Sequence, residues 1–120
     1  MSQRVAVECL KIGKEWVAEK VHTLEKNREL VWNAVKSMKG TVKTCGAFYF
    51  LIKLPEGVKD MDAVTYLATK WNVLVIPCNS TGVEGYLRVS YGNLRYEDCQ
   101  KAAEALKQGL ESIQRGKWLK

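Results

Sequence analysis

The chain has no residue in a sequence pattern that enzymes use for covalent chemistry. Its one histidine, His22, lies in a helical pattern with no cysteine or serine partner nearby, so we interpret it as a helix-surface residue rather than a catalytic base. The four cysteines, Cys9, Cys45, Cys78 and Cys99, are too far apart for a metal-binding knuckle or a CxxC redox pair. We expect Cys45 and Cys99 to be small buried hydrophobic residues.

Signals for other classes of protein are missing as well. Neither of the common phosphate-binding glycine loops occurs, and Ser80 and Thr81 lack the surroundings of a nucleophile elbow. No apolar run approaches the length of a membrane span, and Glu8 and Lys11 interrupt any signal-peptide core. We therefore expect no metal site and no membrane partner, and a reducing, cytoplasmic location.

The composition is that of an ordinary globular protein. The chain has 120 residues, of which 47% are hydrophobic and 27% charged, with a formal net charge of +6. This length predicts one domain spanning residues 1–120. The positive charges alternate with glutamates along the first third of the chain, which is typical of a solvated helix face. We therefore interpret the charge as a solubilising surface, or a face for an acidic partner domain, rather than a nucleic-acid footprint.

A long helix is predicted from residue 3 to 38, where proline is absent and the only glycine is Gly13. Its apolar residues recur at helical spacing: Val17, Val21, Leu24, Val31, Val35 and Met38. Such a helix is about 50 Å long, whereas a compact domain of this size is about 35 Å across. We therefore divide the domain into an extended helix (1–40) and a compact part (41–120). The helix either bends near Gly13 or contacts something outside the compact part.

Two strands and a helix are predicted next. The apolar run from Cys45 to Leu54 predicts a central strand, because both of its alternating faces are apolar. Asp60 is the expected N-cap of the following helix, which Asn72 ends in a left-handed conformation. Residues 73–76 predict a second buried strand, which Pro77 stops.

A third strand and a last helix complete the expected fold. Residues 86–90 form the strand, and an apolar stripe marks the helix: Cys99, Ala102, Ala103, Leu106, Leu110 and Ile113. The sequence thus predicts an α+β fold, with a long N-terminal helix and two further helices packed on a small mixed sheet of three to four strands.

Arg88 is the candidate functional residue. It lies in the middle of a short apolar strand, where Tyr86 and Ser90 share its face. One interpretation is a structural ion pair with Glu84 or a helix carboxylate. The other is that the guanidinium binds the carboxylate of a substrate, because its planar fork matches a carboxylate in bidentate geometry.

Several segments resemble one enzyme family. They are Gly46 to Pro55, Leu67-Ala68 through Val73 to Pro77, and Gly85 to Gly92, with Trp16-Val17 and Leu24 to Arg28 in the first helix. Together they resemble the C-terminal small domain of the class I/II (fold type I) pyridoxal-phosphate-dependent aminotransferases. The resemblance covers nearly the whole chain, and Cys78 departs from it by replacing a glycine. It implies that Arg88 binds the α-carboxylate of an amino-acid substrate.

The same resemblance implies that most of the catalytic machinery lies elsewhere. In the family a preceding large domain supplies the Schiff-base lysine and the cofactor contacts, and none of those motifs occurs here; Lys39 lacks the flanking pattern. We therefore expect no cofactor in this chain and no transaminase activity from it alone. An isolated exposed arginine–carboxylate pair contributes about 0–1 kcal/mol, so we expect only weak binding of an amino acid or 2-oxo acid.

Two alternatives stay open. The chain could be a basic module that uses the same fold to bind a protein or a nucleic acid, for which steep salt dependence would be the sign. It could also be an interaction domain whose long helix docks onto a larger chain, such as the missing large domain, or pairs with itself.

Overall fold

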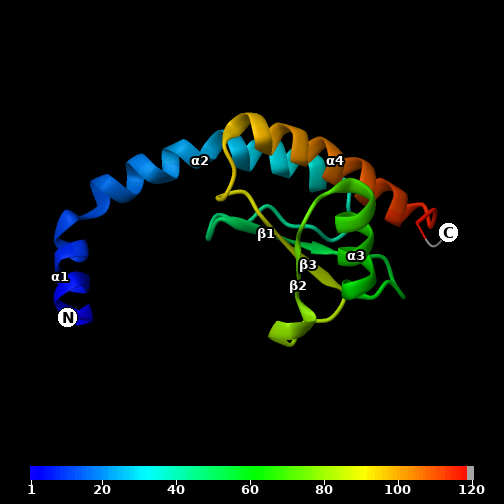
Figure 1. The fold of residues 1–120 in the computed structure, drawn as a ribbon, viewed down its shortest axis with the longest axis horizontal. Helices are drawn as coiled ribbons and strands as arrows, with labels where there is room; N and C mark the ends of the chain where they lie inside the picture. The colour runs from blue at the N-terminus through cyan, green and yellow to red at the C-terminus, as the bar shows by residue number, and fades with distance from the viewer. Residues whose placement is uncertain (119–120) are drawn as a thin grey trace.

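The computed structural model describes residues 1–118. These residues form four helices, a short 3₁₀ helix and three strands (Figure 1). In chain order they are α1 (Ser2–Ile12), α2 (Lys14–Val35), β1 (Tyr49–Lys53), α3 (Asp60–Trp71), β2 (Ile76–Pro77), the 3₁₀ helix η1 (Asn79–Thr81), β3 (Tyr86–Ser90) and α4 (Tyr96–Gln114). The predicted α+β class is confirmed.

The long N-terminal helix is broken in two at Gly13. The glycine has a φ of 81°, a left-handed value that a glycine adopts without a steric penalty. Every residue from 1 to 23 is exposed, and α1 contributes no buried residue at all. Figure 1 shows α1 and the first half of α2 as an arm that leaves the compact part of the molecule. The arm explains why the longest dimension is 53 Å, against 31 and 25 Å for the other two.

The sheet differs from the prediction in two respects. Its order is β1-β3-β2 and both pairings are antiparallel, so it is not mixed. The central strand is β3, and β1 is at an edge. The prediction of a central β1 was wrong because apolar residues on both faces of a strand do not require burial on both. In the structure one face of β1 is buried through Phe50 and Ile52, while Leu51 on the other face remains 44% exposed.

The second predicted strand is also shorter than expected. Only Ile76 and Pro77 pair with β3, and the buried strand predicted over 73–76 is wrong in that respect. Val73 and Val75 point into the core, whereas Leu74 is 83% exposed. Pro77 belongs to the strand rather than stopping it. A proline has no N–H to donate to a neighbouring strand, so it fits in an edge strand, and β2 is at an edge of the sheet.

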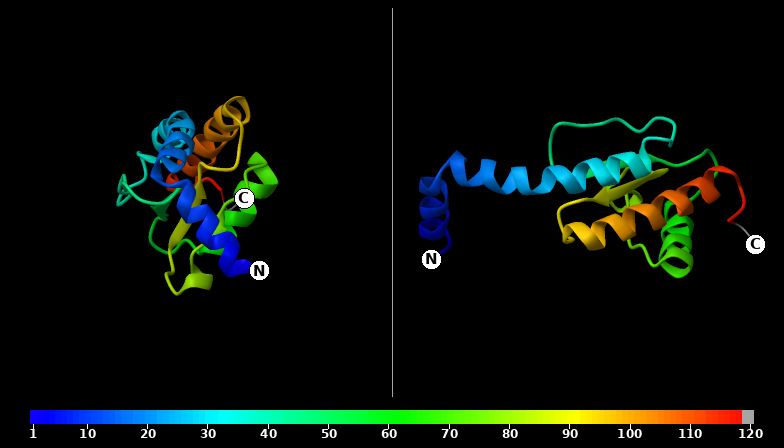
Figure 2. Two further views of the ribbon diagram at one scale, coloured as in Figure 1. Left: turned by 90° about the vertical axis from the view of Figure 1, so that its left-hand side faces the viewer. Right: turned by 90° about the horizontal axis from the view of Figure 1, so that it is seen from above.

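The core lies between the sheet and the helices. In Figure 1 and Figure 2, α2 and α4 run side by side over the sheet, and α3 lies against α4. The predicted stripe of α4 is buried except at Ala102, which is half-buried. Gly109 lets α3 approach α4 closely, because a Cβ at this position would lie 2.5 Å from a methyl group of Leu67.

Candidate functional site

Arg88 lies in the middle of β3, the central strand. Its Cα is paired with Leu51 of β1 on one side and with Ile76 of β2 on the other. Leu87 and Val89, the neighbours of Arg88 in sequence, are buried in the core, so Arg88 belongs to the opposite face of the sheet. We call this second face, carried by alternate residues of the three strands, the outer face.

The guanidinium of Arg88 lies over an aromatic ring rather than beside an acid. Its Cζ lies 4.1 Å from the ring centroid of Tyr49. No carboxylate of residues 1–118 forms an ion pair with Arg88, so the alternative of a structural ion pair with Glu84 or a helix acid is wrong for the described residues. The Nε atom of Arg88 is buried and has no hydrogen-bond partner within them.

A buried acid holds the loop that precedes β3. Asp60 is 4% exposed, and its two carboxylate oxygens accept hydrogen bonds from the backbone N–H of Asn79 (2.9 Å) and Gly85 (2.7 Å). It was predicted as the N-cap of α3, but that position is Lys59, whose side chain makes no cap hydrogen bond. Asp60 is the first residue of the helix, and its carboxylate bridges to the loop instead. The sequence pattern of two acids in the first turn of α3, Asp60 and Asp62, did not indicate this bridge to the loop.

The thiol of Cys78 is near enough to Asp60 and Arg88 for both charges to affect its pKa. It is buried, and burial is the main cause that raises its pKa; the negative charge of Asp60 adds to the increase and the positive charge of Arg88 opposes it. The side chain therefore stays a neutral thiol in the position where the resembling family has glycine. Cys45 and Cys99 were both predicted to be buried. The prediction is confirmed for Cys99 and wrong for Cys45, which is exposed because β1 begins only at Tyr49.

Two residues that fix the far end of β3 were not predicted from the sequence. The buried amide of Asn27 in α2 donates hydrogen bonds to the backbone carbonyls of Tyr91 (3.3 Å) and Leu94 (2.8 Å). The Tyr91 hydroxyl donates to the carbonyl of Ala47 (2.8 Å). The spacing along the helix could have indicated the role of Asn27. This residue follows Leu24 by three positions on the apolar stripe, where a buried polar side chain needs a hydrogen-bond partner.

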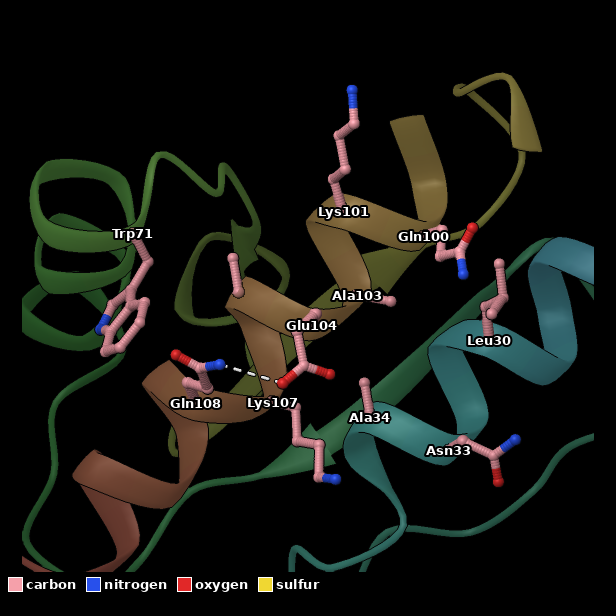
Figure 3. Close-up of a pocket in the computed structure, with 11 residues that line it drawn as sticks. Leu30, Asn33, Ala34, Trp71, Gln100, Lys101, Ala103, Glu104, Lys107 and Gln108 are labelled. Carbon is pink, nitrogen blue, oxygen red and sulfur yellow. Dashed lines mark hydrogen bonds between the residues drawn. The ribbon is translucent and has the colours of Figure 1, made fainter. Parts of the chain in front are cut away.

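Several grooves border these elements. One, of about 400 Å³, runs along the β2 edge towards α4 and has Arg88 in its wall with Val73, Ile76 and Leu94. Another, of about 680 Å³, lies between α2 and α4 with Trp71 at one end (Figure 3). In it the only acid among the lining residues, Glu104, accepts a hydrogen bond from Gln108 at 2.9 Å. That groove contains no cluster of reactive groups.

The remaining candidates are explained by local structure. His22 is exposed, and its Nδ1 is 3.0 Å from the carboxylate of Glu25, three residues along the same helix. The hydroxyls of Ser80 and Thr81 donate to the carbonyls of Pro77 and Cys78 and so stabilise the turn. Within residues 1–118, no three acids, histidines or cysteines gather in a way that could hold a metal ion. No described helix is both long enough and apolar enough to cross a membrane.

The sequence and the fold agree with one group of known proteins. The family model of aminotransferase class I and II matches residues 1–106. This chain belongs to that family. Its members are pyridoxal-phosphate-dependent aminotransferases, as the family resemblance of the sequence predicted.

Similar proteins cover it almost completely, but it covers only part of them. It is 42% identical over 116 residues to the aromatic aminotransferase ISS1 of Arabidopsis thaliana, a match that spans 94% of this chain and 29% of the relative. An aromatic aminotransferase of Pyrococcus horikoshii matches 83% of the chain at 29% identity with a TM-score of 0.72, and a probable N-succinyldiaminopimelate aminotransferase of Thermus thermophilus matches 89% at 25% identity with a TM-score of 0.74. The chain therefore spans about 30% of the length of its relatives.

The described residues of this aminotransferase-family chain do not form a site for pyridoxal phosphate. The group needs a lysine to form an imine, an acid for its ring nitrogen and donors for its phosphate, all converging on one cavity. The lysines that line the grooves, including Lys39, Lys53, Lys101 and Lys107, extend from exposed positions. None of them lines the groove that contains Arg88.

Proposed function

We propose that this chain is the C-terminal small domain of an amino-acid aminotransferase, and that Arg88 binds the α-carboxylate of the amino-acid or 2-oxo-acid substrate. Support comes from the family match and from the segment Gly85 to Gly92, which resembles the substrate-binding strand of the family. The names of two relatives, both aromatic aminotransferases, favour an aromatic amino acid as the substrate of the whole protein.

The observation that carries the proposal is the unpaired guanidinium of Arg88. A buried donor without a partner costs about 1–3 kcal/mol, and proteins rarely retain one without a compensating role. A carboxylate that approaches the outer face would pair with the fork of Arg88. A charge-assisted hydrogen bond of this kind contributes about 1.5–3 kcal/mol when water is excluded.

Water is not excluded in this chain alone. The outer face of the sheet is open, as the exposure of Leu51 and Ile76 indicates, so the contribution of an ion pair falls towards about 0–1 kcal/mol. Binding at 1 mM already requires about 4 kcal/mol. We therefore expect the isolated chain to bind amino acids more weakly than this.

The same proposal assigns the cofactor chemistry to other polypeptide. Pyridoxal phosphate supplies the electron sink that amino-group transfer requires, and the described residues offer no site for it. The role of this chain is to hold one end of the substrate. We also propose that the exposed arm contacts the large domain or, in its absence, a second copy of the chain. The four cysteines are free, which supports a reducing, cytoplasmic location.

The first test is an assay of the full chain by itself. With pyridoxal phosphate and L-phenylalanine plus 2-oxoglutarate, we expect no turnover and no visible cofactor absorbance after dialysis. Retention of an absorbing cofactor together with turnover would contradict the proposal, because it would require a lysine site within these 120 residues.

The second test transfers the chain into a relative. Its sequence replaces the matched 116-residue segment of the 42%-identical Arabidopsis enzyme, and the hybrid is first shown to be active. Arg88→Gln should then lower kcat/KM about 10- to 150-fold, the equivalent of losing a charge-assisted hydrogen bond. Arg88→Lys should retain part of the activity because the charge remains without the fork. Arg115→Gln, at an exposed arginine that follows α4, is the matched control. Equal activity of Arg88→Gln and the control would refute the assignment.

A further inference from the structure

The ring of Tyr49 on β1 lies next to the guanidinium of Arg88 on β3. Tyr49 is paired with Ser90 and Leu51 with Arg88, so Tyr49 is the diagonal neighbour of Arg88 across the β1–β3 pair. Side chains at diagonal positions meet when one is aromatic and the other long. Here they do meet, with the guanidinium carbon 4.1 Å from the ring centroid.

We propose that Tyr49 is a positioning residue for Arg88: its ring fixes the plane of the guanidinium so that the fork faces an incoming carboxylate. The inference rests on the proposed function, because Tyr49 would orient the same guanidinium that is proposed to bind the substrate. A side chain held against a ring loses fewer rotamers on binding than a free one, and an arginine keeps its full charge in that position.

Other contacts show that the ring itself is held in place. Phe48 packs edge-on against Tyr49, with ring centroids 5.9 Å apart and an interplanar angle of 86°. Phe48 in turn lies against Gly92, where an added Cβ would meet its side-chain atoms at 3.3–3.6 Å. Close packing from Gly92 through Phe48 to Tyr49 thus supports the guanidinium from the turn that follows β3.

The arginine lacks the other partners that normally fix a guanidinium. Neither an ion pair nor a hydrogen bond donated by Nε holds it within residues 1–118. The aromatic contact is therefore the interaction that orients Arg88 in the described structure. Tyr49 contacts both Arg88 and Phe48 through its ring. Phenylalanine at position 49 should therefore orient Arg88 as well as tyrosine does, and leucine should not.

Side-chain NMR of the full chain tests the geometry. The sequence contains five arginines, so the Nε–H signal of Arg88 can be assigned from its loss in Arg88→Lys. In the native chain it should lie upfield of the other four through the ring current of Tyr49, and it should exchange slowly with water because Nε is buried. Tyr49→Phe should keep both properties and Tyr49→Leu should lose the upfield shift. Tyr86→Leu, the same substitution on the same face of β3, is the matched control. An unshifted Arg88 signal in the native chain would refute the inference without any variant.

Titration with sodium benzoate, at constant ionic strength with NaCl, tests the consequence for binding. Benzoate should move the Arg88 signal more than the exposed Arg115 signal, and the initial slope should fall about two- to fivefold in Tyr49→Leu, which corresponds to a cation–π contact of this kind. Tyr49→Phe should keep the native slope. If Arg88 responds no more than Arg115, the proposed function fails and the inference with it. If Arg88 responds equally in Tyr49→Leu, the inference alone is refuted.

Discussion

The two faces of the three-stranded sheet differ sharply. The inner face, with Phe50, Ile52 and Leu87, is wholly buried beneath the helices of the same chain. The outer face carries Arg88 and Tyr49 between apolar side chains that remain about half exposed, such as Leu51. The inner face is thus covered by this chain, whereas the outer face leaves apolar side chains in contact with water.

The largest difference between the faces should appear in stability. Leu87→Ala opens a cavity in the inner face and should lower the free energy of unfolding by about 3 kcal/mol. Leu51→Ala, the same change on the outer face, should cost under about 1 kcal/mol because the side chain is already half in water. Urea denaturation of both variants measures the difference. Equal losses would mean that the outer face is covered in solution.

A smaller effect is expected at the loop between β2 and β3. Asp60→Asn should lower the free energy of unfolding by about 2 kcal/mol, because a neutral amide replaces the carboxylate that accepts two backbone hydrogen bonds. Asp62→Asn removes a charge from the same helix turn without those bonds and is the control. Hydrogen exchange should show faster opening of the Asn79 and Gly85 amides in Asp60→Asn alone. Equal exchange in both variants would contradict the bridging role.

The surface of α2 should respond to pH through Glu29. A hydrogen bond from Lys43 is the main cause that lowers the pKa of Glu29 below 4.5; burial opposes it, and the charges of Lys43, Arg28 and Lys36 assist. A lowered pKa stabilises the fold above the ordinary pKa, and the contribution is lost as the pH falls through the folded value. Lys43→Gln should therefore raise the pKa of Glu29, measured by NMR titration. Lys36→Gln should change it much less, and a larger change there would contradict this order of causes.

The smallest effect is expected from removing the arm. Deletion of residues 1–12 takes away α1, which has no buried residue, so the free energy of unfolding should change by less than about 0.5 kcal/mol. Urea denaturation at several protein concentrations provides the measurement. A larger loss that grows with protein concentration would show that α1 pairs between copies of the chain.

Periodicity and turn chemistry account for the parts of the fold that were predicted correctly. The α+β class, the α4 stripe, the left-handed Asn72 at the end of α3 and the position of Arg88 in a strand are all visible in local patterns. The edge position of β1 was not visible, because apolar residues on both faces suggest burial whether the cover comes from this chain or from another. The bridge from Asp60 to Asn79 and Gly85 was also out of reach, since it joins positions 19 and 25 residues apart.

The Tyr49–Arg88 contact could not be predicted for a similar reason. The sequence around Tyr49 does not indicate Arg88 as its neighbour, nor the reverse, because the contact depends on the register in which β1 and β3 pair. That no acid of residues 1–118 pairs with Arg88 could be seen only in the structure, whereas the place of Arg88 on the outer face required only the alternation along the strand.

The amide of Asn27 has a consequence for the order in which the chain folds. It binds carbonyls 64 and 67 positions later, and α2 packs on α4, which comes after the strand that unites the sheet. Closing such distant pairs costs entropy before any contact repays it, so folding should be slow for a domain of this size. During synthesis, the residues that precede α4 keep apolar side chains uncovered until α4 has emerged from the ribosome.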